Sequence, residues 1–386
     1  MKKQYMTLSG MLACCLLACQ GEKQPEAIPE IEIGRAMDAA GAFGISEMAD
    51  GLSFVALETT DSSLIGSFPD VAAWGDKIIV SSQNQPLLVF DRKDGRFRNS
   101  IGYLGDGPEA CAKDAVGNVS FCIDPANGTV YLRALGNRSL LRYGLDGRFL
   151  GRVTPDMGTP ESVLLNYYFL LVANDTATVH NKAVFPGNPY MVHFSGRDGH
   201  FLDTVPSIVS PAPPGSEIAS IGVMILEPST FGATGTMQLE YKDGKALHIV
   251  PGSPSLWSCG GERYLKEAFI DTVYTVGRNS LTPRLALNAG KWRWPYEKKF
   301  DREGSGSRIA IDYMLENEHT LYFHFHTGLH GGQEQRQAYC GFYDKRSGNT
   351  KVMEGDRIED DLYHFLPLTV SRVSASGEFL GLIQAA

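Results

Sequence analysis

Three histidines in the C-terminal third of the chain are the first candidates for chemistry. His324 and His326 are two residues apart, so on a β-strand their imidazoles point to the same side, and His330 follows shortly after. Imidazole nitrogens bind transition metals, which makes these residues a candidate metal site. The alternative is that Phe323 and Phe325 face a sheet interface while the histidines line a sheet surface or a central channel. Neither an HExxH motif nor a carboxylate at a fixed spacing accompanies them.

A second candidate site consists of Trp292, Arg293 and Trp294, which are consecutive in the sequence. On a strand the two indoles share one face, and with the neighbouring guanidinium they can form a stacking platform for a sugar or a peptide. Core packing between sheets uses the same residue types and is the alternative interpretation.

The sequence contains none of the common catalytic motifs, so no catalytic residue is predicted. Gly102, Gly105 and Gly107 have the spacing of a phosphate-binding loop, but no strand-loop-helix pattern surrounds them, and we expect a tight turn between sheets. There is no GxSxG nucleophile motif. No EF-hand-like acidic spacing occurs and no cofactor is predicted, although Ca²⁺ or another divalent metal would suit the oxygen ligands of a central channel.

The composition indicates a globular protein built from many short strands. Hydrophobic residues make up 43% of the 386 residues, and 42 Gly and 20 Pro are spread along the chain. No helix-length apolar periodicity follows residue 50, which favours an all-β architecture. The formal net charge is -9 and no segment concentrates Lys and Arg, which argues against nucleic acid as a partner.

The N-terminus has the pattern of a lipoprotein signal peptide. Lys2 and Lys3 precede an apolar run over residues 6–17, and Leu-Leu-Ala stands directly before Cys19. A run of this length is too short for a membrane span, which needs about 20 residues. Cys19 is therefore the expected lipidation site. Cys14 or Cys15 would leave too short an apolar region.

These signals divide the chain into three parts. Residues 1–18 are predicted to be the signal peptide, 19–50 the lipid-anchored cysteine with a flexible tether, and 51–386 the β domain. The cell envelope is the predicted location. The outer membrane is favoured because Gln20 is not the aspartate typical of inner-membrane retention, and which face the domain occupies is left open. The pairing of Cys111, Cys122, Cys259 and Cys340 is also left open.

A repeated hairpin pattern sets the predicted fold. Asp94-Gly95, Asp146-Gly147 and Asp198-Gly199 each stand between alternating apolar segments, at a constant separation of 52 residues. Glycine accepts the positive φ that such turns require, and the alternation places one face of each strand against a neighbouring sheet. Weaker copies follow at 239–250, 271–285, 340–354 and 373–383. The interval indicates a repeat architecture.

The repeat is best explained by a six-bladed β-propeller. Six repeats over residues 51–386 average about 56 residues each, and seven of about 48 are the less favoured alternative. Leu52–Leu57 is predicted to be a strand that completes the final blade and closes the ring. Loops such as 206–217 and 294–307 would lie at a rim, where propellers build binding surfaces.

The chain resembles a known group of proteins in several of these segments. Several segments are similar to the six-bladed β-propeller lipoproteins with NHL-like repeats of Gram-negative gut commensals, namely residues 56–71, 90–110, 119–132, 271–276 and 281–295. The most specific piece is the Ile-Gly-x-x-Gly-x-Gly-Pro-Glu stretch at 101–109. Gly107-Pro108-Glu109 stands where those proteins commonly have Gly-Pro-Gly-Glu, and 155–190 matches poorly. The resemblance implies the fold and the lipid anchor, and carries no general chemistry.

Two functions remain open from the sequence. The favoured one is a monomeric, lipid-anchored binding module for a glycan, a peptide or an envelope protein, which uses its loop rim. The alternative is a metal-dependent hydrolase or lyase with its site in the central channel. Stoichiometric metal in the purified protein would favour the enzyme.

Overall fold

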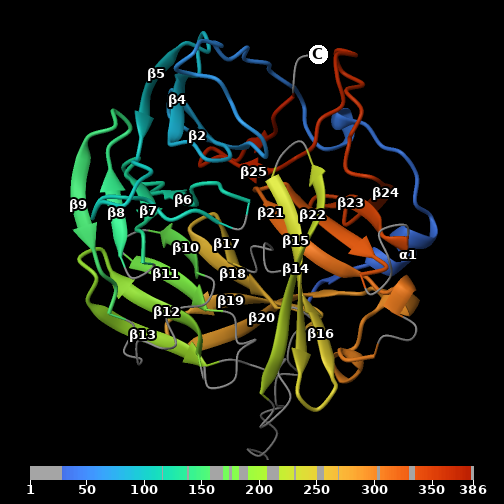
Figure 1. Cartoon of the computed structure of the whole chain (residues 1–386). Helices are drawn as coiled ribbons and strands as arrows, with labels where there is room; N and C mark the ends of the chain where they lie inside the picture. Colours follow the sequence, from blue (N-terminus) through green and yellow to red (C-terminus); the bar gives the residue numbers. More distant parts are fainter. Residues whose placement is uncertain are drawn as a thin grey trace, which may run out of the picture.

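The computed structural model describes an all-β protein of many small sheets (Figure 1). Neighbouring strands are antiparallel, apart from one short parallel strand near the N-terminus. The structure describes residues 28–114, 116–136, 139–156, 168–173, 176–181, 190–206, 217–229, 232–249, 256–267, 269–301, 305–329 and 335–383. In these ranges no helix is long and apolar enough to cross a membrane.

Three four-stranded sheets come first along the chain. The first sheet contains β2 (Asp70–Trp74), β3 (Lys77–Ser81), β4 (Leu87–Asp91) and β5 (Phe97–Ile101). The second sheet contains β6 (Phe121–Ile123), β7 (Val130–Arg133), β8 (Leu140–Tyr143) and β9 (Phe149–Val153). The third sheet contains β10 (Tyr168–Ala173), β11 (Thr176–Asn181), β12 (Tyr190–Gly196) and β13 (Phe201–Pro206). Figure 1 shows the three succeeding one another down one side of the molecule.

A three-stranded inserted sheet follows, made of β14 (Ile218–Ser229), β15 (Gly232–Tyr241) and β16 (Ala246–Ile249). The fourth sheet contains β17 (Leu256–Cys259), β18 (Glu262–Lys266), β19 (Thr272–Gly277) and β20 (Ser280–Leu287), with β1 (Glu30–Ile31) parallel to β20. The fifth sheet contains β21 (Ala310–Glu316), β22 (Thr320–Thr327), β23 (Gln337–Asp344) and β24 (Thr350–Glu354). A final pair consists of β25 (Arg372–Val373) and β26 (Phe379–Leu380).

The few helices are short. They are α1 (Ile33–Asp38) and the 3-10 helices η1 (Ile45–Glu47), η3 (Gly290–Trp292), η4 (Tyr296–Lys298) and η5 (Ser305–Ser307).

The three turns predicted from the 52-residue interval are confirmed. Gly95, Gly147 and Gly199 have φ of 69°, 81° and 91°, and each lies between the third and fourth strands of its sheet. A Cβ on Gly147 would lie 2.7 Å from the carbonyl oxygen of Ser100, and one on Gly199 would lie 2.5 Å from that of Thr154. The turns at Gly147 and Gly199 thus pack closely against the end of the preceding sheet, which is a second reason for glycine there.

Consecutive sheets pack against each other through their first strands. β6 contacts β10, β10 contacts β17, and β17 contacts β21. The final pair contacts both the fifth sheet and β2 of the first. Fully buried apolar side chains fill the interfaces, each contributing about 1.5–3 kcal/mol by its removal from water. Examples are Val89 with Leu132, Val192 with Leu265, and Val273 with Phe323.

The flexible tether predicted for residues 19–50 is wrong from residue 30 onward. Ile31 is 0% exposed and Ile33 is 1% exposed, and both pack between the fourth and fifth sheets. Phe43 and Ile45 are also buried, against the fifth sheet and the segment after it. The burial of these apolar residues keeps the segment in the fold, so the folded domain begins about twenty residues earlier than predicted. Residues 1–27, with the predicted signal peptide and Cys19, lie outside the described residues.

Two other predictions about the repeat need correction. Residues 52–57 form no regular strand and so do not complete a final blade; directly after them, the amide of Glu58 donates to the carbonyl of Gly95 in the first sheet at 2.8 Å. The amide of Asp156 makes the same contact with Gly199 at 2.7 Å. The copy at 239–250 belongs to the inserted sheet, where the Asp243-Gly244 turn joins β15 to β16. Because of this insertion, the turn between β19 and β20 of the fourth sheet follows Gly199 by more than the 52 residues that separate the first three turns.

Candidate functional site

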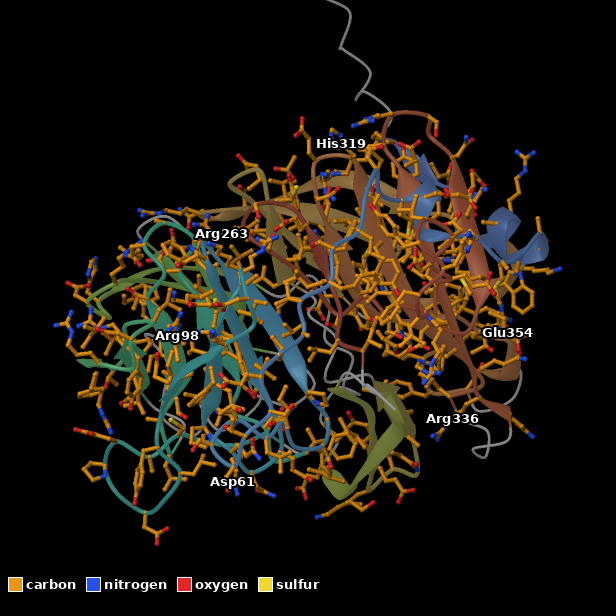
Figure 2. All side chains as sticks on the ribbon, turned by 90° about the horizontal axis from the view of Figure 1, so that it is seen from above. Asp61, Arg98, Arg263, His319, Arg336 and Glu354 are labelled. Carbon is orange, nitrogen blue, oxygen red and sulfur yellow. The ribbon has the colours of Figure 1, made fainter. Side chains whose placement is uncertain are left out.

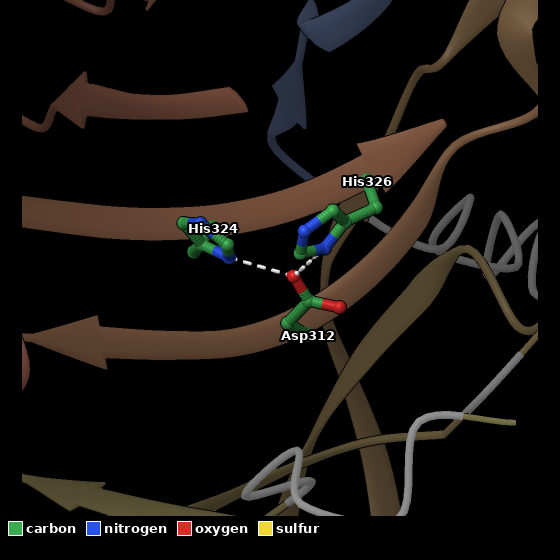
Figure 3. A group of neighbouring side chains, drawn as sticks. All are labelled: Asp312, His324 and His326. Atoms are coloured by element: carbon green, nitrogen blue, oxygen red, sulfur yellow. Dashed lines mark hydrogen bonds and ion pairs between the residues drawn. The ribbon is translucent and has the colours of Figure 1, made fainter. Parts of the chain in front are cut away.

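A β-bulge in the fifth sheet places a carboxylate next to two of the predicted histidines. Ile311 and Tyr313 of β21 pair with consecutive residues of β22, so Asp312 is an extra residue between the two pairs. An extra residue re-aims the side chains around it, and bulges are enriched near functional sites. The carboxylate of Asp312 consequently lies on the same side of the sheet as His324 and His326 (Figure 3).

Both imidazoles meet the same oxygen of this carboxylate. Nδ1 of His324 lies 2.6 Å from Oδ2 of Asp312, and Nδ1 of His326 hydrogen-bonds to the same atom. The two imidazole centroids are 5.1 Å apart and the ring planes are inclined at 73°. The ligand atoms of the three residues all lie within 4.8 Å of one another. His330, the third predicted histidine, lies outside the described residues.

The site is buried, and its imidazoles favour the ionised form of its carboxylate. Asp312 is 0% exposed, His324 4% and His326 8%. Burial raises the pKa of Asp312, but the charge of His326 and the hydrogen bonds from both imidazoles more than offset this effect and hold the pKa below its usual value. The other carboxylate oxygen, Oδ1, is buried without a hydrogen-bond partner among the described residues.

Aromatic packing fixes the orientation of His324. Its ring stacks on Tyr313 with centroids 5.0 Å apart and planes within 6°, and the Tyr313 hydroxyl donates to the carbonyl of Val370 at 2.8 Å. Cys340 of β23 pairs with His324 across the strands. Burial raises the pKa of the Cys340 thiol to about 12, so it stays neutral at physiological pH.

The phenylalanines of β22 face a sheet interface, as the alternative interpretation of the sequence predicted. Phe323 and Phe325 are both 0% exposed and pack in one cluster with Val273 and Leu285 of the fourth sheet. Because side chains alternate along β22, the histidines lie on the opposite face.

This arrangement offers two chemistries. A carboxylate that accepts a hydrogen bond from Nδ1 fixes the tautomer and the orientation of an imidazole. With the ring protons on Nε2 instead, both Nδ1 atoms and Oδ2 present lone pairs to one region, which is a donor set for a transition metal.

Trp292 and Trp294 do not share a strand face, so the predicted stacking platform is wrong in its geometry. Trp292 ends η3 and its Nε1 donates to Asp38 at 3.0 Å. Trp294 is buried against Phe269 and Leu329, with the two aromatic centroids 5.2 Å apart. Arg293 forms an ion pair with Asp271. The segment leaves β20 and turns, because Gly290 adopts a φ of 53°.

A second buried carboxylate on β21, Glu316, has a structural role. Its oxygens accept from Trp257 Nε1 at 2.7 Å and from Arg284 at 2.9 and 2.5 Å. Nζ of Lys345 lies 2.6 Å away as a further ion pair. The carboxylate is thus surrounded by donors from β17, from β20 and from the turn after β23, and it joins the fourth sheet to the fifth.

Sequence reasoning missed Asp312 and Glu316. The available signal was their position in AIDYMLE, where two acidic residues interrupt an otherwise apolar strand. Buried acidic residues are rare unless paired, so the pattern indicated partners. The identity of the partners depends on strand register, which the sequence does not show. Cys111, Cys122, Cys259 and Cys340 are present as thiols rather than disulfides.

The comparison with protein families provides an assignment. Residues 28–386 match the family model described as "Domain of unknown function (DUF4934)". The chain belongs to the DUF4934 family. The match begins close to β1, in agreement with the start of the folded domain.

Two of the solved structures similar to this DUF4934 protein come from Bacteroides species. One, described as an exported protein of Bacteroides fragilis, has a TM-score of 0.53 at 16% identity and covers 85% of this chain and 80% of its own. Another, a DUF4221 family member from Bacteroides vulgatus, has a TM-score of 0.46 at 9% identity, covering 78% and 86%. The first likeness bears on the fold alone. A comparison with curated protein sequences finds no match.

Proposed function

We propose that this protein is a lipid-anchored envelope protein that binds an extended peptide segment of a partner on a six-bladed β-propeller scaffold. The propeller interpretation is supported by the order of sheet contacts, in which β25 of the final pair contacts both β21 and β2. Export is supported by the signal-peptide pattern before Cys19, and the Bacteroides fragilis protein of similar fold is described as exported.

The observation that carries the binding proposal is the inserted sheet. β14 is 12 residues long and lies at the edge of this sheet, paired on one side with β15 in the part of the chain that the structure describes. Its sequence, IASIGVMILEPS, is rich in apolar residues, and Ile221 is 51% exposed. A long apolar edge strand presents unpaired backbone groups and is a template for an additional strand from another chain.

The position of the inserted sheet supports a separate role for it. β10 and β17 contact each other although the inserted sheet lies between them in the sequence. The regular packing of sheets therefore does not need residues 218–249, which leaves them available for a partner. The inserted sheet is held at its base by Tyr241 and Leu247, which pack against Phe269 and Phe300.

A peptide array probed with the full chain tests this role. We expect wild-type protein to capture a set of extended, apolar peptides, and Ile221→Lys to reduce the signal because a charge on the edge opposes strand addition. Ile218→Val, at the half-buried base of the same strand, is the matched control. Equal capture by wild type and Ile221→Lys, or preferential capture of glycans on a parallel array, would contradict the proposal.

The anchor has its own test. A chain with Cys19→Ser should lose incorporation of labelled fatty acid and move from the membrane fraction to the soluble fraction. Retention in the membrane without lipid incorporation would show that the N-terminal segment is not a lipoprotein signal.

A further inference from the structure

We propose that Asp312, His324 and His326 form a binding site for one divalent transition-metal ion of the Zn²⁺ or Co²⁺ class. This inference goes beyond the peptide-binding role and does not depend on it, because the site lies in the fifth sheet and not in the inserted sheet.

The first argument is the convergence of the donor atoms. The bulge at Asp312 and the two-residue spacing of His324 and His326 bring one carboxylate and two imidazoles to a common point. Figure 3 shows both rings turned toward the carboxylate from the neighbouring strand. Two nitrogen donors and one oxygen donor suit Zn²⁺, Co²⁺, Ni²⁺ or Fe²⁺. Ca²⁺ and Mg²⁺ take oxygen ligands, so they fit this set poorly.

The second argument comes from the two buried carboxylates of β21. Glu316 is balanced by the cations of Arg284 and Lys345. Asp312 is equally buried, yet its ion-pair partners among the described residues are imidazoles alone. An ionised carboxylate inside a protein is costly unless its charge is compensated. An imidazole carries a charge only when it is protonated, so a bound cation would compensate Asp312 at every pH, as Arg284 and Lys345 compensate Glu316.

The third argument is the unused oxygen of Asp312. Both imidazoles meet Oδ2, and Oδ1 is buried without a partner in the described part of the chain. A buried acceptor without a donor costs about 1–3 kcal/mol, and native structures contain few of them. A metal bound by both carboxylate oxygens would satisfy Oδ1 as well as Oδ2.

Metal binding at this site requires the Nδ1 atoms of both imidazoles to be free of protons. Bonds form from Nδ1 of His324, Nδ1 of His326 and the Asp312 carboxylate to the metal. Each Nδ1 must then be without a proton: a neutral ring moves its proton from Nδ1 to Nε2 by exchange with solvent, with no net release, and a doubly protonated ring keeps its Nε2 proton and releases the other to solvent. Three protein ligands leave one tetrahedral position for a further ligand.

The experiment uses the full chain, purified and freed of metal with EDTA. Titration with CoCl₂ is followed by visible absorption and by metal analysis after dialysis. We expect one Co²⁺ per chain, displaced by ZnCl₂ and not by a large excess of CaCl₂. X-ray absorption of the zinc-loaded wild type should show nitrogen and oxygen neighbours, including imidazole, without sulfur.

Variants assign the bound metal to the three residues. Asp312→Asn and His324→Asn should each weaken Co²⁺ binding by at least about tenfold. Even the loss of a residue that only hydrogen-bonds to a metal ligand commonly lowers metal affinity by about 10- to 100-fold. His319→Ala is the matched control, because His319 is exposed just before β22, at the end of the fifth sheet away from Arg336 (Figure 2). Its affinity should equal that of wild type.

Several results would overturn the proposal. They are less than stoichiometric Co²⁺ in the wild type, a thiolate absorption band or sulfur neighbours, displacement by Ca²⁺, or folded Asp312 and His324 variants that keep wild-type affinity. Should both variants fail to fold, the stoichiometry and the ligand types of the wild type still decide, because they need no substitution.

Discussion

Arg372 and Asp70 form an ion pair across 302 positions of the sequence, with Nε of the arginine 3.3 Å from Oδ1 of the aspartate. Arg372 begins β25 and Asp70 begins β2, so the pair ties the final strands of the chain to the first sheet. The guanidinium also lies over the ring of Phe121, 4.7 Å from its centroid, at the start of the second sheet. One side chain therefore connects three parts of the fold.

We expect Arg372→Met to lower the free energy of unfolding by about 1 kcal/mol, a modest value because both partners keep partial contact with water. Urea unfolding measures the change, and a cycle with Asp70→Asn isolates the pair. Arg148→Met is the control, since Arg148 is 74% exposed beside Asp146 within one turn. If the two arginine substitutions cost the same, the pair does not hold the ends together.

Substitution of Glu316 should be more damaging. Glu316→Gln removes the charge that Arg284 and Lys345 face inside the protein, so the expected loss is about 3–5 kcal/mol. Thermal and urea unfolding provide the measurement. Glu318→Gln, at an exposed position two residues away, should change stability little. A cost below about 1 kcal/mol for Glu316→Gln would show that the network is not required.

The stability of the protein should fall in acid partly through Glu378. A hydrogen bond from Arg92 lowers the pKa of Glu378 from 4.5 to about 2. Because the folded pKa lies below the unfolded one, this contribution is fully present above pH 4.5 and is lost as the pH falls toward 2. Glu378→Gln should flatten the dependence of unfolding free energy on pH in this window. Parallel pH curves for wild type and variant would contradict the assignment.

Two glycine turns allow the contributions of backbone strain and of close packing to the free energy of unfolding to be measured separately. Gly147→Ala introduces a side chain at a φ of 81° and 2.7 Å from the carbonyl oxygen of Ser100, and should cost about 2–3 kcal/mol. Gly136→Ala, at a φ of 88° with nothing within 4 Å, should cost about 1 kcal/mol. Equal losses in urea unfolding would mean that the contact with the preceding sheet is unimportant.

Much of the fold could be predicted from local patterns. The turns at Gly95, Gly147 and Gly199 were found because a tight turn needs a residue that accepts positive φ, and this requirement acts within a few positions of the chain. The alternation around them identified the strands for the same reason. The extent of the domain was missed, since residues 30–45 carry only scattered apolar side chains whose burial depends on distant sheets.

The sequence by itself therefore determined where the chain turns, that it forms short strands, and that His324 and His326 share a face, because these properties depend on neighbouring residues. Only the tertiary structure decided that Asp312 meets the two imidazoles, since this depends on the register and bulge between β21 and β22. It also decided that Trp292 and Trp294 separate and that Arg372 reaches Asp70. Such contacts arise from packing between distant segments, which no local pattern records.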